Sequence, residues 1–135
     1  MQKDIEKLKA RTQDRPQDAD AWIDLGLALI DKRDQEGGIK ALKEAVRVSP
    51  DSHRAHVNLG NALRRFKAWD SAEVAFKNAL KLKPDSAGAH HQYGQLLRLM
   101  GKSKEAVQEF KTYLEIRPDA ADSDEVNGWI DKLTR

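Results

Sequence analysis

Proline interrupts this sequence at a constant interval. The four prolines are Pro16, Pro50, Pro84 and Pro118, and each stands 34 residues after the one before it. Proline stops helices because its ring removes a backbone hydrogen bond and clashes with the preceding turn. Equally spaced stops divide the chain into segments of equal length. The spacing therefore predicts an internal structural repeat in place of a single irregular core.

Glycine and apolar residues recur at the same interval. Within the first segment two apolar stripes have helical spacing, one before and one after a polar turn, which predicts a pair of helices. Glycine inside a helix costs about 1 kcal/mol relative to alanine, so we expect a neighbouring helix to approach closely there. The recurring sets are Gly26, Gly60 and Gly94; Leu25, Leu59 and Tyr93; Leu29, Leu63 and Leu97; and Leu42, Phe76 and Phe110.

The repeated pattern resembles the tetratricopeptide repeat family, whose signature is W-x2-L-G-x2-Y, then A-x3-F, then P, over 34 residues. The resemblance covers residues 19–120 in three successive copies. The copies depart from it at His56 and His90, which replace tryptophan, and at Gly38 and Tyr113, which replace small residues. It implies an all-α, right-handed superhelix of stacked antiparallel helix pairs, that is, an α-solenoid.

The expected organisation is a single domain over residues 1–135. Residues 1–18 form a half-repeat or N-terminal cap helix; residues 19–52, 53–86 and 87–120 form three repeats, and residues 121–135 form a C-terminal capping helix. The half-repeat suggests either a natural cap or a fragment of a longer array. No apolar stretch near the start is typical of a signal peptide or a membrane anchor, so a cytoplasmic location is the default expectation.

Composition and motifs argue against catalysis. The chain has 24 basic and 22 acidic side chains, so its charge is nearly balanced. It has no cysteine, which excludes a disulfide framework and thiolate chemistry. No nucleophile elbow, phosphate loop or zinc-protease motif occurs. His53 and His56 have no third metal ligand nearby, and His56 and His90 are interpreted as packing residues. We therefore expect neither an enzyme nor a bound metal or cofactor.

The resemblance implies that the first helix of each pair lines a concave groove that binds a peptide. Side chains that vary between repeats are expected there: amides that bind an extended main chain, arginines that favour carboxylates, and an apolar strip on the first helix. The predicted function is a scaffold that binds an extended, acidic or carboxylate-bearing segment of another protein. The predicted groove residues are Asp20, Ile23, Asp24, Leu27, Arg54, Asn58, Asn61, Arg64, Arg65, His91, Gln92, Gln95 and Arg98.

Two alternatives and one exclusion accompany this prediction. The chain could self-assemble as a homo-oligomer through its groove or its ends. Lysines on the second helices could form a basic convex face for nucleic acid, although no aromatic residues interrupt them as base stacking requires. Family members that clamp the C-terminal carboxylate of heat-shock chaperones use a particular set of groove residues. Only Asn58 matches that set here, so this kind of adaptor is disfavoured.

Overall fold

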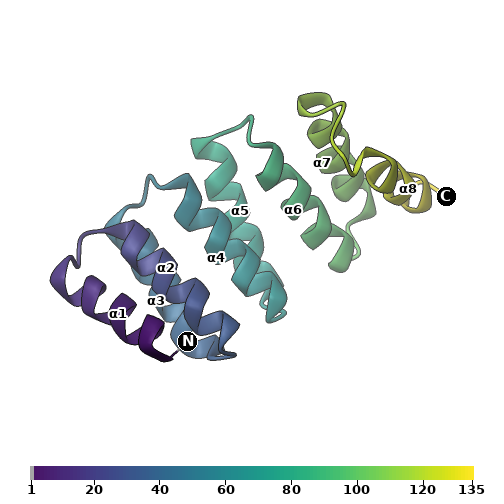
Figure 1. Cartoon of the computed structure of the whole chain (residues 1–135). Coiled ribbons are helices and arrows are strands. Elements are labelled where there is room, and N and C mark those ends of the chain that lie inside the picture. The colour runs from purple at the N-terminus through teal and green to yellow at the C-terminus, as the bar shows by residue number, and fades with distance from the viewer. Residues whose placement is uncertain (1) are drawn as a thin grey trace. The chain divides into compact units, whose positions relative to one another are not determined.

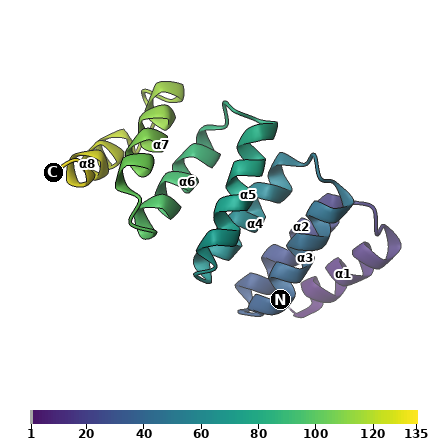
Figure 2. The same cartoon turned by 180° about the vertical axis from the view of Figure 1, so that it is seen from behind.

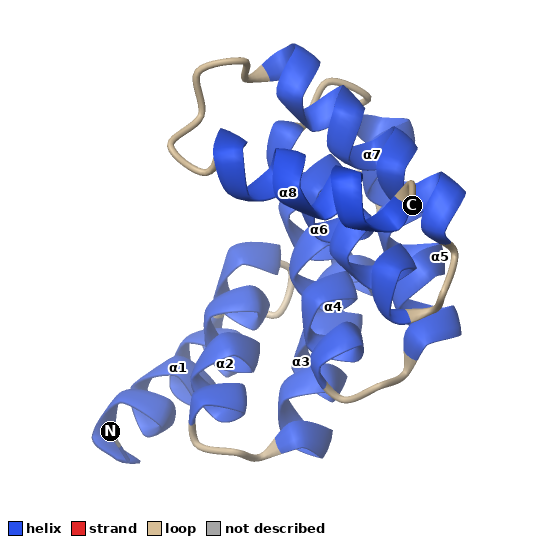
Figure 3. Cartoon of the chain, turned by 90° about the vertical axis from the view of Figure 1, so that its right-hand side faces the viewer, coloured by secondary structure: helices blue, strands red, loops and turns tan. Residues whose placement is uncertain are grey.

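The computed structural model describes residues 2–135, and every regular element in that range is a helix (Figures 1 and 3). The helices are α1 (Gln2–Asp14), α2 (Ala19–Asp31), α3 (Gln35–Val48), α4 (His53–Arg65), α5 (Trp69–Leu82), α6 (Ala87–Leu99), α7 (Ser103–Ile116) and α8 (Ser123–Leu133). These boundaries place two helices in each predicted repeat and one helix in each terminal segment. The prolines lie between helices, as expected.

The helices form two compact units, which are described separately. The first ends at Leu82 and contains α1 to α5, and the second begins at Lys83 and contains α6 to α8. In the first unit α2 packs on α3 and α4 on α5, while α1 packs on α2 and α4 contacts both α2 and α3. The pairing of α2 with α3 is visible from both sides (Figures 1 and 2). In the second unit α6 packs on α7, and α7 packs on α8.

The turn inside each helix pair uses the same backbone conformation. Arg33, Lys67 and Gly101 have φ angles of 66°, 64° and 77°, and they follow one another at the 34-residue interval. This left-handed conformation is strained for residues with a Cβ atom. Only the third turn uses glycine, so a helix pair of this kind forms with or without glycine at the turn.

Helix starts are also repeated. Asp18, Ser52 and Ser86 are N-cap residues whose side chains accept a hydrogen bond from the backbone N–H three residues later. Such caps satisfy one of the backbone donors that a helix leaves free at its N-terminus. They follow the prolines by two residues, which explains why a stop and a new start occur together in the sequence.

The glycines within the first helices allow close packing. A Cβ atom at Gly94 would lie 2.6 Å from Phe110, and one at Gly60 would lie 3.0 Å from Phe76. At Gly26 it would lie 2.8 Å from Leu42. The expected close approach of a neighbouring helix is therefore confirmed, and the neighbour is the second helix of the same pair. The large residue that recurs on that helix occupies the space that glycine leaves.

A second recurring contact explains why histidine can replace tryptophan. The Trp22 indole N–H donates to the carbonyl of Pro16 at 2.9 Å. His56 Nε2 lies 2.8 Å from the carbonyl of Pro50, and His90 Nε2 lies 2.7 Å from that of Pro84. Both histidines are buried. Tryptophan and histidine share a flat ring with a nitrogen that can donate, so either ties the first helix to the carbonyl of the preceding proline.

Candidate functional site

Ion pairs join the predicted ligand-binding residues at the start of α2 and α4. Arg54 Nη1 lies 2.8 Å from Asp20 Oδ1, and Arg54 Nη2 lies 3.1 Å from Asp24 Oδ1. Arg11, on α1, donates to the other oxygen of Asp24 at 2.9 Å. Three of the predicted groove residues are thus brought together, but they bind one another. Because one guanidinium already faces two carboxylates, Arg54 offers little charge to a carboxylate ligand.

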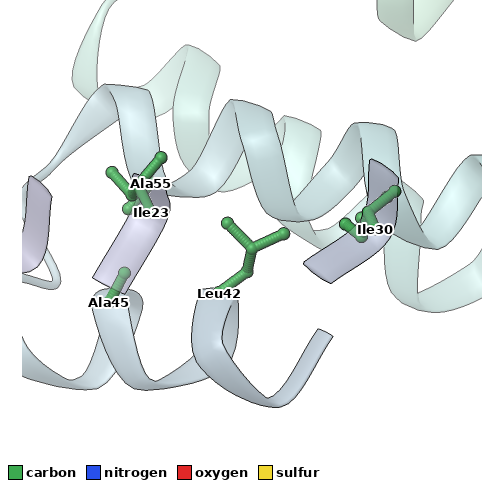
Figure 4. Close-up of a cluster of buried hydrophobic side chains, with 6 residues drawn as sticks. Ile23, Ile30, Leu42, Ala45 and Ala55 are labelled. Carbon is green, nitrogen blue, oxygen red and sulfur yellow. The ribbon is translucent and has the colours of Figure 1, made fainter. Parts of the chain in front are cut away.

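Ile23 lies in the hydrophobic core of the first unit. Its side chain is 0% exposed and packs with Leu42, Ala45 and Ala55, as the close-up shows (Figure 4). The prediction that Ile23 lines a ligand-binding groove is wrong. Helical spacing placed it next to Asp24, but α4 packs against this side of α2 and covers the side chain.

Three other predicted residues of the first unit are accessible at its surface. We call them the α2–α4 face: Leu27, Asn58 and Arg65. Leu27 is 36% exposed. Asn58 uses its Nδ2 donor on the carbonyl of Arg54, one turn earlier at 2.9 Å. Its Oδ1 receives no hydrogen bond from the described residues. Arg65 is exposed and has no ion pair among the residues whose side chains the structure describes.

Asn61 and Arg64 are partly buried members of the same helix. The Oδ1 atom of Asn61 is buried, and none of the described residues donates to it. A buried acceptor without a donor is unfavourable by roughly 1–3 kcal/mol. A main-chain N–H from a bound segment would relieve this cost if it reached the amide.

In the second unit the predicted residues contact α8 and the chain that precedes it. The guanidinium carbon of Arg98 lies 4.5 Å from the ring centre of Trp129, and Arg98 Nη2 donates to Gln95 at 2.8 Å. The ring of His91 packs edge-on against Tyr113 and Trp129, at centroid distances of 4.8 and 5.7 Å. Arg98, Gln95 and His91 are therefore engaged within the unit, so they are poor candidates for primary ligand contacts.

Asp122 joins the loop before α8 to the rest of the second unit. It occupies the N-cap position of α8 but forms no capping bond. Instead, its Oδ1 accepts a hydrogen bond from the Tyr113 hydroxyl at 2.6 Å, and its Oδ2 lies 3.1 Å from His91 Nε2. The hydrogen bond from Tyr113 lowers the pKa of Asp122 below its usual value, although burial opposes the shift.

A hollow of about 300 Å³ lies beside this carboxylate. Gln92 lines it, and its Oε1 atom is buried without a donor among the described residues. Of the lining residues, only His91 and Gln92 are predicted from the sequence. Tyr113 departs from the small residue usual at its position, which is the one sequence signal that could have indicated this site. The hollow is lined by Gly88, His91, Gln92, Tyr113, Arg117 and Asp122.

Neither a metal centre nor a membrane-spanning helix occurs in the described part of the chain. Across residues 2–135, no three side chains of histidine, aspartate or glutamate are grouped so as to hold a metal ion. None of the helices in that range combines the length and apolar character needed to cross a lipid bilayer.

The chain matches two models that both describe a tetratricopeptide repeat, one over residues 24–76 and the other over residues 63–126. Together the matches span well over half of the chain. It belongs to the tetratricopeptide repeat family. The predicted helical repeat solenoid is therefore confirmed, whereas the handedness of the superhelix and the division into three repeats stay predictions. As a member of this family, the chain is a protein–protein interaction module, and such modules are generally non-catalytic.

Solved tetratricopeptide repeat structures have a similar fold. A crystal structure of MamA is 21% identical, with a TM-score of 0.80, and the alignment covers 96% of this chain and 84% of MamA. The first such domain of Spaghetti (RPAP3), bound to an HSP90 peptide, is 19% identical with a TM-score of 0.80 over 88% of this chain and 95% of that domain. The domain of Arabidopsis OM64 is 16% identical, with a TM-score of 0.78 over 84% and 94% of the two chains. Comparison with curated protein sequences gave no significant match.

Proposed function

We propose that this tetratricopeptide repeat protein binds an extended segment of another protein and that Arg65 contacts a carboxylate of that segment. The observation that carries the proposal is the contrast between Arg65 and two other predicted arginines. Arg54 is paired with two carboxylates, and Arg98 is stacked on Trp129. Arg65 is exposed at the end of α4, so its guanidinium is available for a bidentate contact with a carboxylate.

The remaining residues of the α2–α4 face suit an extended main chain. The Oδ1 atom of Asn58 can accept a backbone N–H, since the donor side of this amide is already used within α4. Leu27 offers an apolar contact on the neighbouring helix. Main-chain hydrogen bonds supply affinity for extended segments, while a charged contact and an apolar contact add specificity.

The bound HSP90 peptide of the RPAP3 structure, SRMEEVD, contains acidic residues. This likeness makes an acidic ligand a reasonable choice for the first test. The identity of the ligand does not transfer, because Asn58 alone matches the residues with which the family clamps chaperone tails.

A peptide array tests the proposal directly. Seven-residue peptides that carry glutamate at one position would be compared with the same peptides carrying glutamine, against the wild type and the Arg65→Glu variant. The matched control is Lys81→Glu, which makes the same charge change on the exposed surface of α5. We expect the glutamate peptides to be preferred by the wild type and by Lys81→Glu and not by Arg65→Glu. Equal preference in all three proteins would overturn the role of Arg65.

Self-assembly is the alternative to this proposal, and nucleic-acid binding is a less favoured one. Gel filtration over a range of concentrations tests the first, and titration with an oligonucleotide at two salt concentrations tests the second, because binding to phosphates weakens steeply with salt.

A further inference from the structure

Residues that line the hollow of the second unit match, by repeat position, the residues that form an ion-pair cluster in the first unit. Asp20, Arg54, Gly88 and Asp122 follow one another at the 34-residue interval. In the first unit the guanidinium of Arg54 lies against Asp20 and Asp24. In the second unit the residues at the matching positions are Gly88, Gln92 and Asp122, and all three line the hollow. Where the first unit has the cationic Arg54 between two carboxylates, the second unit has the anionic Asp122 beside a hollow.

Three sequence differences explain the open space. Gly88 has no side chain, and a Cβ atom added to it would meet nothing within 4 Å. Gln92 stands where the first unit has the carboxylate of Asp24. Asp122 stands where the first unit has Arg54, and its shorter, anionic side chain contacts Tyr113 on α7 and His91 on α6. In the described part of the second unit no arginine or lysine forms an ion pair with Asp122, although Arg117 lines the hollow near Tyr113.

The groups around the hollow favour a donor that carries positive charge. The carboxylate of Asp122 is held in its ionised form by the Tyr113 hydroxyl, which lowers its pKa. The Oε1 atom of Gln92 is buried and lacks a donor among the described residues. Both groups are acceptors, and each oxygen of Asp122 keeps a lone pair beyond its contact with Tyr113 or His91. Arg117 is the one lining residue with a permanent positive charge, and it is exposed and has no ion pair among the side chains that the structure describes.

We propose that this hollow binds the guanidinium of an arginine side chain from the protein partner, which donates to Asp122 and Gln92 as Arg54 donates to Asp20 and Asp24. The proposal rests on the proposed function in that the arginine belongs to the bound segment. Arginine suits the site better than lysine because its planar group presents several donors in a fixed arrangement. The partner then carries both a carboxylate, for Arg65, and a guanidinium, for the hollow.

The test uses small probes in place of the unidentified partner. N-acetyl-arginine amide would be titrated into the full chain and followed by the NMR signals of the Gln92 side-chain amide and the Trp129 indole. N-acetyl-citrulline amide is the uncharged control of the same shape, and N-acetyl-glutamate amide is the anionic control. We expect only the arginine probe to shift the Gln92 signal in a saturable way. Shifts of equal size with citrulline, or stronger binding of the glutamate probe, would overturn the proposal.

Four variants locate the binding. Gly88→Leu fills the hollow, and Gly128→Leu is its control, since Gly128 is also a helix glycine whose added Cβ atom would meet nothing within 4 Å. We expect Gly88→Leu and Asp122→Asn to weaken binding of the arginine probe by roughly tenfold, and Gly128→Leu to leave it unchanged. Arg117→Gln should strengthen it by removing a like charge. Weaker binding of the arginine probe in Arg117→Gln, or unchanged binding in Gly88→Leu, would contradict the assignment.

The two tests are independent. The arginine probe does not involve Arg65, and the glutamate peptides report on the α2–α4 face. Circular dichroism would check that Gly88→Leu keeps its helical fold. Loss of arginine binding in both Gly88→Leu and Asp122→Asn then locates the probe in the hollow.

Discussion

Arg54 and Asp20 occupy the same position of successive helix pairs, 34 residues apart, and their side chains form an ion pair of 2.8 Å. The sequence alone predicts that both contact a ligand. Their mutual contact instead joins the beginning of α4 to the beginning of α2, and Asp24 and Arg11 extend the connection to α1. A repeat position that varies in sequence therefore contributes to stacking within the first unit.

This ion pair is expected to contribute modestly to stability. In a double-mutant cycle with Arg54→Gln and Asp20→Asn, the coupling free energy should be about 0.2–1 kcal/mol at low salt, because both side chains are largely exposed. It should fall as salt is added. Urea unfolding of the four proteins measures it. Arg65→Gln is the control, because Arg65 is assigned to ligand binding and Arg54 to stacking. If Arg65→Gln lost as much stability as Arg54→Gln, this assignment would be contradicted.

Two glycines at the same repeat position should respond in opposite ways to alanine. At Gly94 the new Cβ would lie 2.6 Å from Phe110, so Gly94→Ala should lower the free energy of unfolding by about 1–3 kcal/mol. At Gly128 nothing lies within 4 Å, so Gly128→Ala should raise it by about 0.5–1 kcal/mol through helix propensity. Urea unfolding gives both values, and a change of the same sign in both would refute the close-packing explanation.

The hydrogen bond between Tyr113 and Asp122 should make stability depend on pH. It lowers the pKa of Asp122 and raises that of Tyr113. The Asp122 contribution is complete above its unfolded pKa and is lost as pH falls through the lower folded pKa. The Tyr113 contribution is complete below its unfolded pKa and is lost as pH rises through the higher folded pKa.

Tyr113→Phe should therefore cost about 1 kcal/mol between these limits, and less at both extremes of pH. The measurement is urea unfolding of both proteins from acid to alkaline pH. A difference between wild type and variant that stays constant over the whole range would show that the hydrogen bond does not stabilise the folded state.

The contacts with the proline carbonyls should contribute similarly in different repeats. Trp22→Phe and His56→Phe each remove the ring nitrogen that faces the carbonyl of Pro16 or Pro50 while keeping an aromatic ring. We expect each to lower the free energy of unfolding by about 1 kcal/mol, since the carbonyl loses its partner. Phe66→Leu, which removes no such nitrogen, serves as the comparison. No loss in either ring variant would mean that these residues act through packing alone.

Residues with a purely local or repeated steric role were predictable. Proline ends a helix whatever surrounds it, and a glycine that recurs in phase with a large residue implies two helices in close contact. Spacing alone predicted the close approach at Gly94 but not that Phe110 is the residue that fills the space. The same reasoning failed for Ile23, because helical spacing gives the angle of a side chain around its own helix and not the direction from which the next helix approaches.

The sequence by itself determined the helix pairs, their period and the family, since these depend on backbone sterics and on apolar periodicity that each segment carries within itself. The tertiary structure decided which polar side chains bind other residues of the protein and which remain accessible to a ligand. Arg54 and Arg65 lie on one helix with the same charge, yet only contacts with other helices distinguish them. The hollow beside Asp122 depends likewise on the direction in which one carboxylate turns, which is set by Tyr113 and His91 from two different helices.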